Sequence, residues 1–216
     1  VYMLLLLALA DTVKCIPKGQ HFIASASEPI ILPSNVDYDE ADYEVELAII
    51  IGRQCKNVSV SKAGDYVLGY AVANDVTARK HQEKTSQWSY AKGMDADIVN
   101  AQMIMTNLHQ DGFCPLGPCI VSTEQIPDAA RLNLKTRLNG KIMQNGSADD
   151  MIFSIPEIVS YVSQVQNNSL FQTKELILDV RATHYCPGPS SSPERLVVLA
   201  SHRARHSSSN PEMSCE

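Results

Sequence analysis

The chain has 216 residues, of which 44% are hydrophobic and 19% are charged, so it is long enough for one domain with a substantial core. Its formal net charge of −6 and pI of 5.5 exclude a strongly basic surface for nucleic acid or anionic membranes. The six cysteines include no Cys-x-x-Cys pair, which argues against a zinc site and favours a reduced chain, cytoplasmic or mitochondrial.

The N-terminal segment, residues 1–28, begins with the apolar run MLLLLALAD and continues without clear periodicity. The run is too short to span a bilayer. It is similar to the hydrophobic region and cleavage site of a secretory signal, and Asn-x-Ser triplets at Asn57, Asn145 and Asn167 fit that alternative. The other interpretation of the run is a buried strand or helix. Secretion is therefore the minor alternative for localisation.

Short strands and helices are expected from about residue 29 onward. EPIILPSN indicates a strand that Pro33 ends, and YEVELAIIIG (43–52) indicates a second one, because its residues alternate between two faces. SVSKAGDYVLGYAVAND predicts a short helix with its N-cap near Ser59 or Ser61, and then a strand that runs into Asp75.

The remaining elements follow further along the chain. Asn139-Gly140 is a strong signal for the turn of a β-hairpin, and a second turn is expected at Asn145-Gly146. SIPEIVSYVSQV predicts a helix with Ser154 as its N-cap and Pro156 in its first turn. After about residue 169 the composition, rich in Ser, Pro, Arg and His, predicts a disordered tail over 169–216.

Two glutamates stand in the strand predicted at 43–52. Alternation places Glu44 and Glu46 on one face, about 6.6 Å apart along the strand. Like charges this close repel, and a buried, unpaired carboxylate is costly, so we expect a positive group between them or a solvated face. Asp75 can complete a set of three carboxylates, which suits Mg²⁺. The alternative is an exposed polar strand face, which spacing alone does not exclude.

Five segments resemble one known family. They are DYEVELAIIIGR, DYVLGYAVANDVTAR, QWSYAKGMD, FCPLGPCIV and LNGKIMQNGSADDMIFSIPEIVSYVSQ. In this order they are similar to the fumarylacetoacetate hydrolase superfamily, in its C-terminal catalytic-domain branch, which includes acylpyruvate hydrolases and related decarboxylases. The resemblance implies an α+β catalytic domain over 29–168, built on a mixed, highly curved β-sheet roll that is incomplete here and pairs as a homodimer.

The resemblance also implies roles for particular residues. The E-x-E metal pair of the family matches Glu44 and Glu46, and its third metal carboxylate, in the N-D-x-[ST]-A-R motif, matches Asp75. The metal expected there is Mg²⁺, with Mn²⁺ or Ca²⁺ as alternatives. The active-site lysine of the K-G-x-D motif matches Lys92.

Two further residues are implied to bind substrate. Gln82 lies where family members place a glutamine near the substrate, and Arg79 belongs to the metal-carboxylate motif, with a structural role as its stronger interpretation. The substrate class is a small 1,3-dicarbonyl or 2-oxo acid. The implied activity is metal-dependent hydrolysis of a C–C bond. An oxaloacetate-type decarboxylase on the same site is the alternative.

The chain departs from the family pattern in three places. Residues 1–28 lack the G-x-N-Y motif and the His and Glu that activate water, and neither His21 nor Glu28 has the motif context for that role. An insertion at 96–112 follows the lysine motif. Residues 169–216 replace a segment whose Thr and Gly line the substrate pocket. These departures keep two other hypotheses open: a non-catalytic, metal-binding relic, and a secreted glycoprotein.

Overall fold

The structure, a computed structural model, combines β-sheets with a few short helices. It describes residues 2–9, 12–19, 23–27, 29–33, 35–37, 39–84, 86, 88, 90–93, 112–164, 175–178, 200–202 and 212–215. Sheets of seven, four and two strands are formed by these residues. This arrangement confirms the predicted α+β class with mixed sheets, whereas the strong curvature stays a prediction.

The largest sheet has the strand order β2-β1-β11-β5-β6-β8-β3. Its strands are β1 (Tyr2–Leu9), β2 (Thr12–Gly19), β3 (Ile23–Ser25), β5 (Val45–Ile51), β6 (Val67–Asn74), β8 (Cys114–Ser122) and β11 (Glu175–Leu178). The pairs β1–β11 and β3–β8 are parallel, and the other neighbours are antiparallel. The sheet is therefore mixed.

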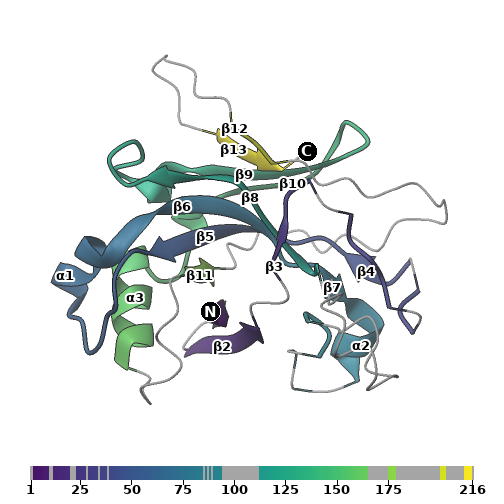
Figure 1. The fold of residues 1–216 in the computed structure, drawn as a ribbon, viewed down its shortest axis with the longest axis horizontal. Coiled ribbons are helices and arrows are strands. Elements are labelled where there is room, and N and C mark those ends of the chain that lie inside the picture. The colour runs from purple at the N-terminus through teal and green to yellow at the C-terminus, as the bar shows by residue number, and fades with distance from the viewer. Residues whose placement is uncertain are drawn as a thin grey trace, which may run out of the picture.

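The smaller sheets and the helices surround it. The four-stranded sheet consists of β9 (Asn133–Leu138), β10 (Lys141–Ser147), β12 (Ala200–His202) and β13 (Glu212–Cys215), and β4 (Ala41–Asp42) pairs with β7 (Thr77–Ala78). The α-helices are α1 (Val60–Ala63), α2 (Arg79–Glu83) and α3 (Ile155–Gln164). Single 3-10 turns occupy Gly64–Tyr66, Ala129–Arg131 and Ala148–Asp150. Helices α1 and α3 lie at one end of the large sheet, and α2 lies at the other with β4 and β7 (Figure 1).

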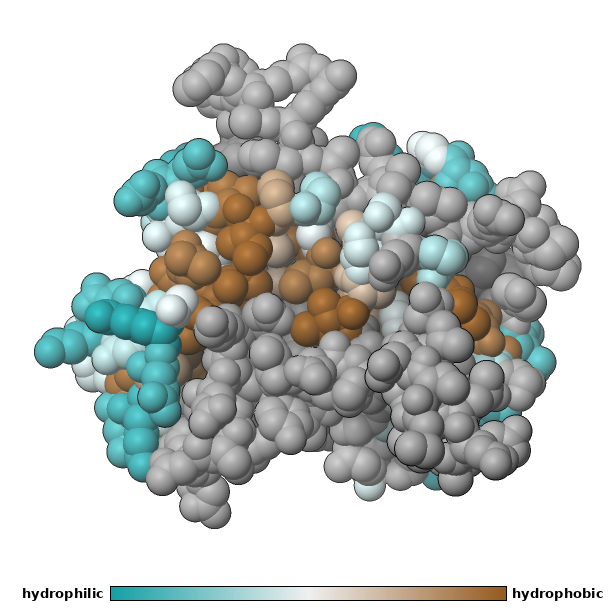
Figure 2. All heavy atoms as spheres, viewed as in Figure 1, coloured by the Kyte–Doolittle hydropathy of each residue, from teal (hydrophilic) through white to brown (hydrophobic). Residues whose placement is uncertain are grey.

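Strand β5 is buried on both faces. Val45, Leu47, Ile49 and Ile51 belong to the main hydrophobic cluster, which also contains residues of β6, β9 and α3. The alternate positions Ala48 and Ile50 pack in a second cluster on the other face. The alternation predicted from the sequence is thus confirmed. Hydrophobic residues gather over the middle of β5 and β6, whereas hydrophilic ones surround α1 (Figure 2).

Several predicted elements are confirmed. Helix α1 begins after Ser59 and leads into β6, which ends immediately before Asp75. The hairpin of β9 and β10 turns at Asn139-Gly140, whose φ angles of 52° and 76° suit this dipeptide. The second turn, at Asn145-Gly146, is wrong: both residues lie inside β10 and pair with Lys135 and Leu134, because the ladder continues past them.

The strand predicted in EPIILPSN is also wrong for the residues described there. Residues 29–33 have no regular structure. Pro29 and Pro33 have no N–H to donate to a ladder. Ile30 and Leu32 instead pack against a third hydrophobic cluster that contains Phe113. The apolar residues of this segment therefore contribute to the core without joining a sheet.

The terminal regions contain strands. The run MLLLLALAD lies largely in β1, and β11 lies between β1 and β5 in the large sheet. In the tail predicted at 169–216, β11, β12 and β13 are described and the rest lies outside the described residues. The insertion at 96–112 also lies outside them, except for Gly112. Among the described residues, no helix is both long and apolar enough to cross a membrane.

Gly69 in β6 gives a first prediction. A Cβ added there would lie 2.3 Å from the carbonyl oxygen of Val121 in the neighbouring strand β8. Because that atom belongs to the backbone, Gly69→Ala is expected to cost about 1–3 kcal/mol of unfolding free energy, measured by denaturant titration. Gly64→Ala is the control, since nothing lies within 4 Å of the added carbon. Equal stability of the two variants would contradict this interpretation.

The N-terminus of α3 gives a second prediction. The Ser154 hydroxyl and N–H donate to Glu157 Oε2 at 2.7 and 2.8 Å, and these bonds lower the pKa of Glu157 from its ordinary value of 4.5. A lowered pKa in the folded state adds stability above the unfolded value, and this is lost as pH falls through the folded value. Glu157→Gln should therefore lower the melting temperature more at pH 7 than at pH 3. An equal decrease at both would contradict the cap.

Candidate metal centre

The pairing of β5 with β6 brings Glu44 and Asp75 together. Glu44 immediately precedes β5 and Asp75 immediately follows β6, and the antiparallel register pairs Val45 with Asn74. The Asp75 N–H donates to the Glu44 carbonyl oxygen at 2.8 Å, and the Glu44 N–H donates to Asn74 Oδ1 at 3.0 Å. These bonds fix the backbone of both acidic residues at one end of the strand pair.

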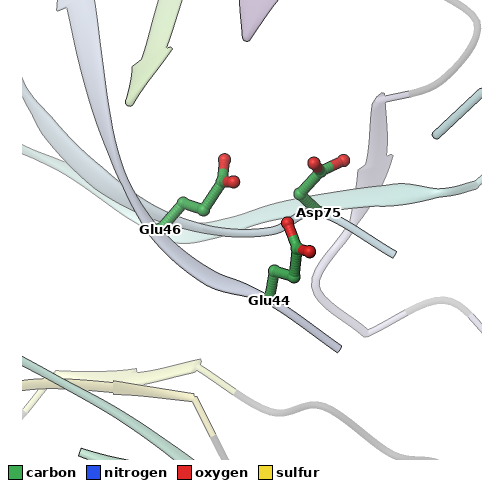
Figure 3. A group of neighbouring side chains, drawn as sticks. All are labelled: Glu44, Glu46 and Asp75. Atoms are coloured by element: carbon green, nitrogen blue, oxygen red, sulfur yellow. The ribbon is translucent and has the colours of Figure 1, made fainter. Parts of the chain in front are cut away.

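Glu46 completes a group of three carboxylates, here called the carboxylate triad (Glu44, Glu46 and Asp75). One oxygen of each lies within 4.8 Å of one oxygen of each of the others, and the three side chains project from the strands toward the same side (Figure 3). Glu46 and Asp75 are fully buried, whereas the Glu44 side chain is 15% exposed. The alternative of an exposed polar strand face is therefore wrong.

Lys92 is the first of two cations at the triad. Its side chain is 1% exposed, and its Nζ lies 2.6 Å from Glu44 Oε2 and 2.5 Å from Asp75 Oδ2. The same Nζ donates to Thr77 Oγ1 at 2.9 Å, so three oxygens account for the three ammonium hydrogens. The Ala78 N–H donates a hydrogen bond to the Ala91 carbonyl oxygen at 2.9 Å, which holds the turn that contains Lys92 beside β7.

Arg79, the first residue of α2, is the second cation. Its Nη1 lies 2.6 Å from Glu44 Oε1, whereas Lys92 contacts the other oxygen of this carboxylate, Oε2. Its Nη2 and Nε lie 2.7 and 2.8 Å from Asp42 Oδ2, and Nη1 also donates to Gln82 Oε1 at 3.0 Å. All three nitrogens thus contact protein oxygens, which favours a structural role for Arg79 over substrate binding.

These contacts affect the pKa values of Glu44 and Asp42. Burial alone would raise the pKa of Glu44, but the charges of Lys92 and Arg79, with their hydrogen bonds, outweigh it and lower that pKa. Burial raises the pKa of Asp42, and the opposing effect of Arg79 is smaller. Glu44 is therefore ionised at neutral pH and is able to act as an anionic ligand.

The donor set fits a hard divalent cation. Carboxylate oxygens are the ligands that Mg²⁺, Mn²⁺ and Ca²⁺ prefer. In their ordinary charge states, the triad and Asp42 exceed the charge of Arg79 and Lys92 by two negative units, which one divalent ion would neutralise. In the part of the chain that the structure describes, no other group of three His, Cys, Asp or Glu side chains converges in this way.

The structure brings together all six predicted site residues, Glu44, Glu46, Asp75, Arg79, Gln82 and Lys92, while their roles stay predictions. Sequence reasoning missed Asp42 and Thr77. Asp42 precedes Glu44 by two residues, so the same alternation was its signal, and Thr77 lies inside the NDVTAR segment. His21 and Glu28, considered for water activation, lie outside the described residues.

The fold and the site define a member of a known family of enzymes. The chain matches the family described as "Fumarylacetoacetate (FAA) hydrolase C-terminal" over residues 10–109 and 97–177. These matches cover well over half of the chain, so it belongs to this family, as the resemblance in its motifs predicted.

Individual relatives include several enzymes. The oxaloacetate tautomerase YisK of Bacillus subtilis is 38% identical over 125 residues, which are 58% of this chain and 36% of that protein. A 2-hydroxyhepta-2,4-diene-1,7-dioate isomerase from Mycobacterium marinum has a TM-score of 0.66 at 33% identity, over 84% of this chain and 63% of its own. Maleylpyruvate hydrolase from Sphingobium sp. SYK-6, in complex with manganese(II) and pyruvate, has a TM-score of 0.61 at 25% identity, over 82% and 57%.

The chain matches only part of its relatives. The first curated relatives are matched over 36% to 53% of their own length. The family assignment rests on the matched domain. The activity, substrate and assembly of the whole protein are therefore matters for proposal.

Proposed function

We propose that the chain is a divalent-metal-dependent hydrolase that cleaves a C–C bond in acylpyruvate-like 1,3-dicarbonyl acids. The observation that carries the proposal is the convergence of three carboxylates, two of which contact the buried ammonium of Lys92. The triad would hold Mg²⁺ or Mn²⁺, and the solved maleylpyruvate hydrolase with manganese and pyruvate supports that choice of metal and substrate class. A homodimer is proposed on the family resemblance alone.

The metal and Lys92 have separate tasks in this proposal. When bound, the divalent ion supplies Lewis-acid chemistry at the carbonyl oxygens of the substrate. Water adds to the acyl carbonyl, and the C–C bond breaks, which releases the acyl group as a carboxylic acid. The electron pair of that bond forms the enolate of pyruvate, which takes up a proton to give pyruvate. Lys92 would donate a hydrogen bond to the enolate oxygen and so stabilise the charge as it develops.

Lys92 must change partners in order to act on a substrate. Its three hydrogens are directed to Glu44, Asp75 and Thr77. Donation to a substrate oxygen therefore requires that one of these bonds be exchanged. The Thr77 hydroxyl is the uncharged partner and makes the longest of the three contacts, at 2.9 Å, so it is the bond that we propose is given up.

A second candidate is enolate chemistry on oxaloacetate without C–C hydrolysis. Decarboxylation of oxaloacetate produces the same enolate of pyruvate, whereas tautomerisation passes through the enolate of oxaloacetate itself. The relative named as an oxaloacetate tautomerase favours this candidate. Neither reaction needs a group that activates water, which is the function that residues 1–28 do not supply by any family motif.

One assay separates these candidates. The purified chain is incubated with Mn²⁺ and either an acylpyruvate or oxaloacetate, and the release of pyruvate, carboxylic acid and CO₂ is measured beside the rate of keto–enol exchange. Metal-dependent release of pyruvate and carboxylic acid from acylpyruvate supports the hydrolase. Turnover of oxaloacetate alone would favour the second candidate, and inactivity on both despite Mn²⁺ binding would indicate a metal-binding relic.

A further inference from the structure

Asp42 is a buried carboxylate beside the metal centre that the proposed function leaves without a role. It is 7% exposed and forms the end of β4. Its Oδ2 accepts hydrogen bonds from Nε and Nη2 of Arg79, at 2.8 and 2.7 Å. The remaining nitrogen, Nη1, contacts Glu44 Oε1 at 2.6 Å. One guanidinium group therefore joins Asp42 to a residue of the carboxylate triad.

Asp42 determines the direction of this guanidinium. The group is planar and rigid, so two nitrogens held by one carboxylate also fix the position of the third. The backbone prepares the contact, because Asp42 pairs with Thr77, two residues before Arg79, in the ladder of β4 and β7. In addition, the Arg79 N–H donates to the Glu40 carbonyl oxygen at 2.9 Å. Both partners are therefore held from the backbone.

Glu44 consequently has a different cation at each oxygen. Oε1 contacts Arg79, and Oε2 contacts Lys92, which also binds Asp75 Oδ2. We infer that Asp42 is a positioning residue, which acts through Arg79 to hold Oε1 of Glu44 and so fixes the orientation of this carboxylate within the triad. The inference rests on the metal site of the proposed function.

The affinity of the full chain for Mn²⁺, measured by isothermal titration calorimetry, tests this role. Asp42→Asn keeps the shape of the side chain but removes its charge, and Arg79→Lys keeps the charge but loses the rigid fork. Loss of a residue that orients a metal ligand typically weakens binding by about 10–100-fold. Both variants should therefore raise the dissociation constant by at least about tenfold.

A matched control separates orientation from charge. Asp39→Asn removes the same charge three residues earlier, where the carboxylate is exposed and contacts Lys80. It should leave the affinity unchanged. The inference is overturned if Asp42→Asn and Arg79→Lys bind Mn²⁺ as tightly as the parent. If Asp42→Asn does not unfold cooperatively without metal, it is not folded, and the Mn²⁺ affinity of Arg79→Lys alone decides the test. A folded parent that binds no Mn²⁺ would overturn the metal site itself, and the inference with it.

Discussion

Lys92→Met is expected to destabilise the metal-free chain by about 3–5 kcal/mol, the cost typical of removing one partner from a buried ion pair. Methionine fills a similar volume but leaves Glu44 Oε2 and Asp75 Oδ2 without the ammonium that both contact. Asp75 is fully buried, so water cannot replace that charge without a rearrangement. Denaturant unfolding in the presence of a chelator measures the loss.

Mn²⁺ should restore more stability to Lys92→Met than it adds to the parent, because a divalent ion supplies the missing positive charge. Lys80→Met is the control. Lys80 also contacts two carboxylates, Asp37 and Asp39, at 3.3 and 3.2 Å, but its side chain is 52% exposed. Such surface pairs add little to stability. If the two variants unfold at the same denaturant concentration, Lys92 is not the counter-ion of the triad.

Glu46→Gln is expected to abolish turnover at Mn²⁺ concentrations that saturate the parent. The substitution keeps the shape of a fully buried side chain but removes one anionic ligand of three. Loss of a direct ligand should weaken metal binding by more than about 100-fold, the upper end of the range for residues that only orient ligands. Initial rates measured against Mn²⁺ concentration give the apparent affinity.

The control for this prediction is Glu40→Gln, which makes the same change at another buried glutamate. Glu40 is 4% exposed and contacts His81 Nδ1 at 3.2 Å, outside the triad. It should retain the apparent affinity of the parent. Glu46→Gln with the same dependence on Mn²⁺ as Glu40→Gln would remove Glu46 from the metal site.

The features that could be predicted from the sequence are those determined by short-range pattern. Alternation identified β5 and placed Glu44 and Glu46 on one face, because a strand has a period of two. The Asn139-Gly140 turn and the Ser154 cap depend on residues that are adjacent or three apart. The prediction of a strand at 29–33 is wrong because it gave the apolar residues more weight than the two prolines.

Contacts between segments far apart in the sequence could not be predicted in the same way. The sequence predicted a positive group between the two glutamates, and Lys92, 48 residues from Glu44, contacts Glu44 and Asp75. No local rule selects this lysine over another one. Asp42 and Arg79 are 37 residues apart and meet because β4 pairs with β7. The insertion of β11 between β1 and β5 likewise depends on pairing across most of the chain. The motif resemblance identified Lys92 as a site residue but did not predict which atoms it contacts.

Thermal unfolding with Mn²⁺ titrated in, on the parent and Glu46→Gln side by side, tests the metal centre most directly. A ligand at about 100 times its dissociation constant adds about 2.7 kcal/mol of stability. We expect a cooperative transition that rises with Mn²⁺ in the parent and stays fixed in Glu46→Gln. A parent whose transition does not respond to Mn²⁺, or a Glu46→Gln that responds equally, would contradict a metal site at the carboxylate triad.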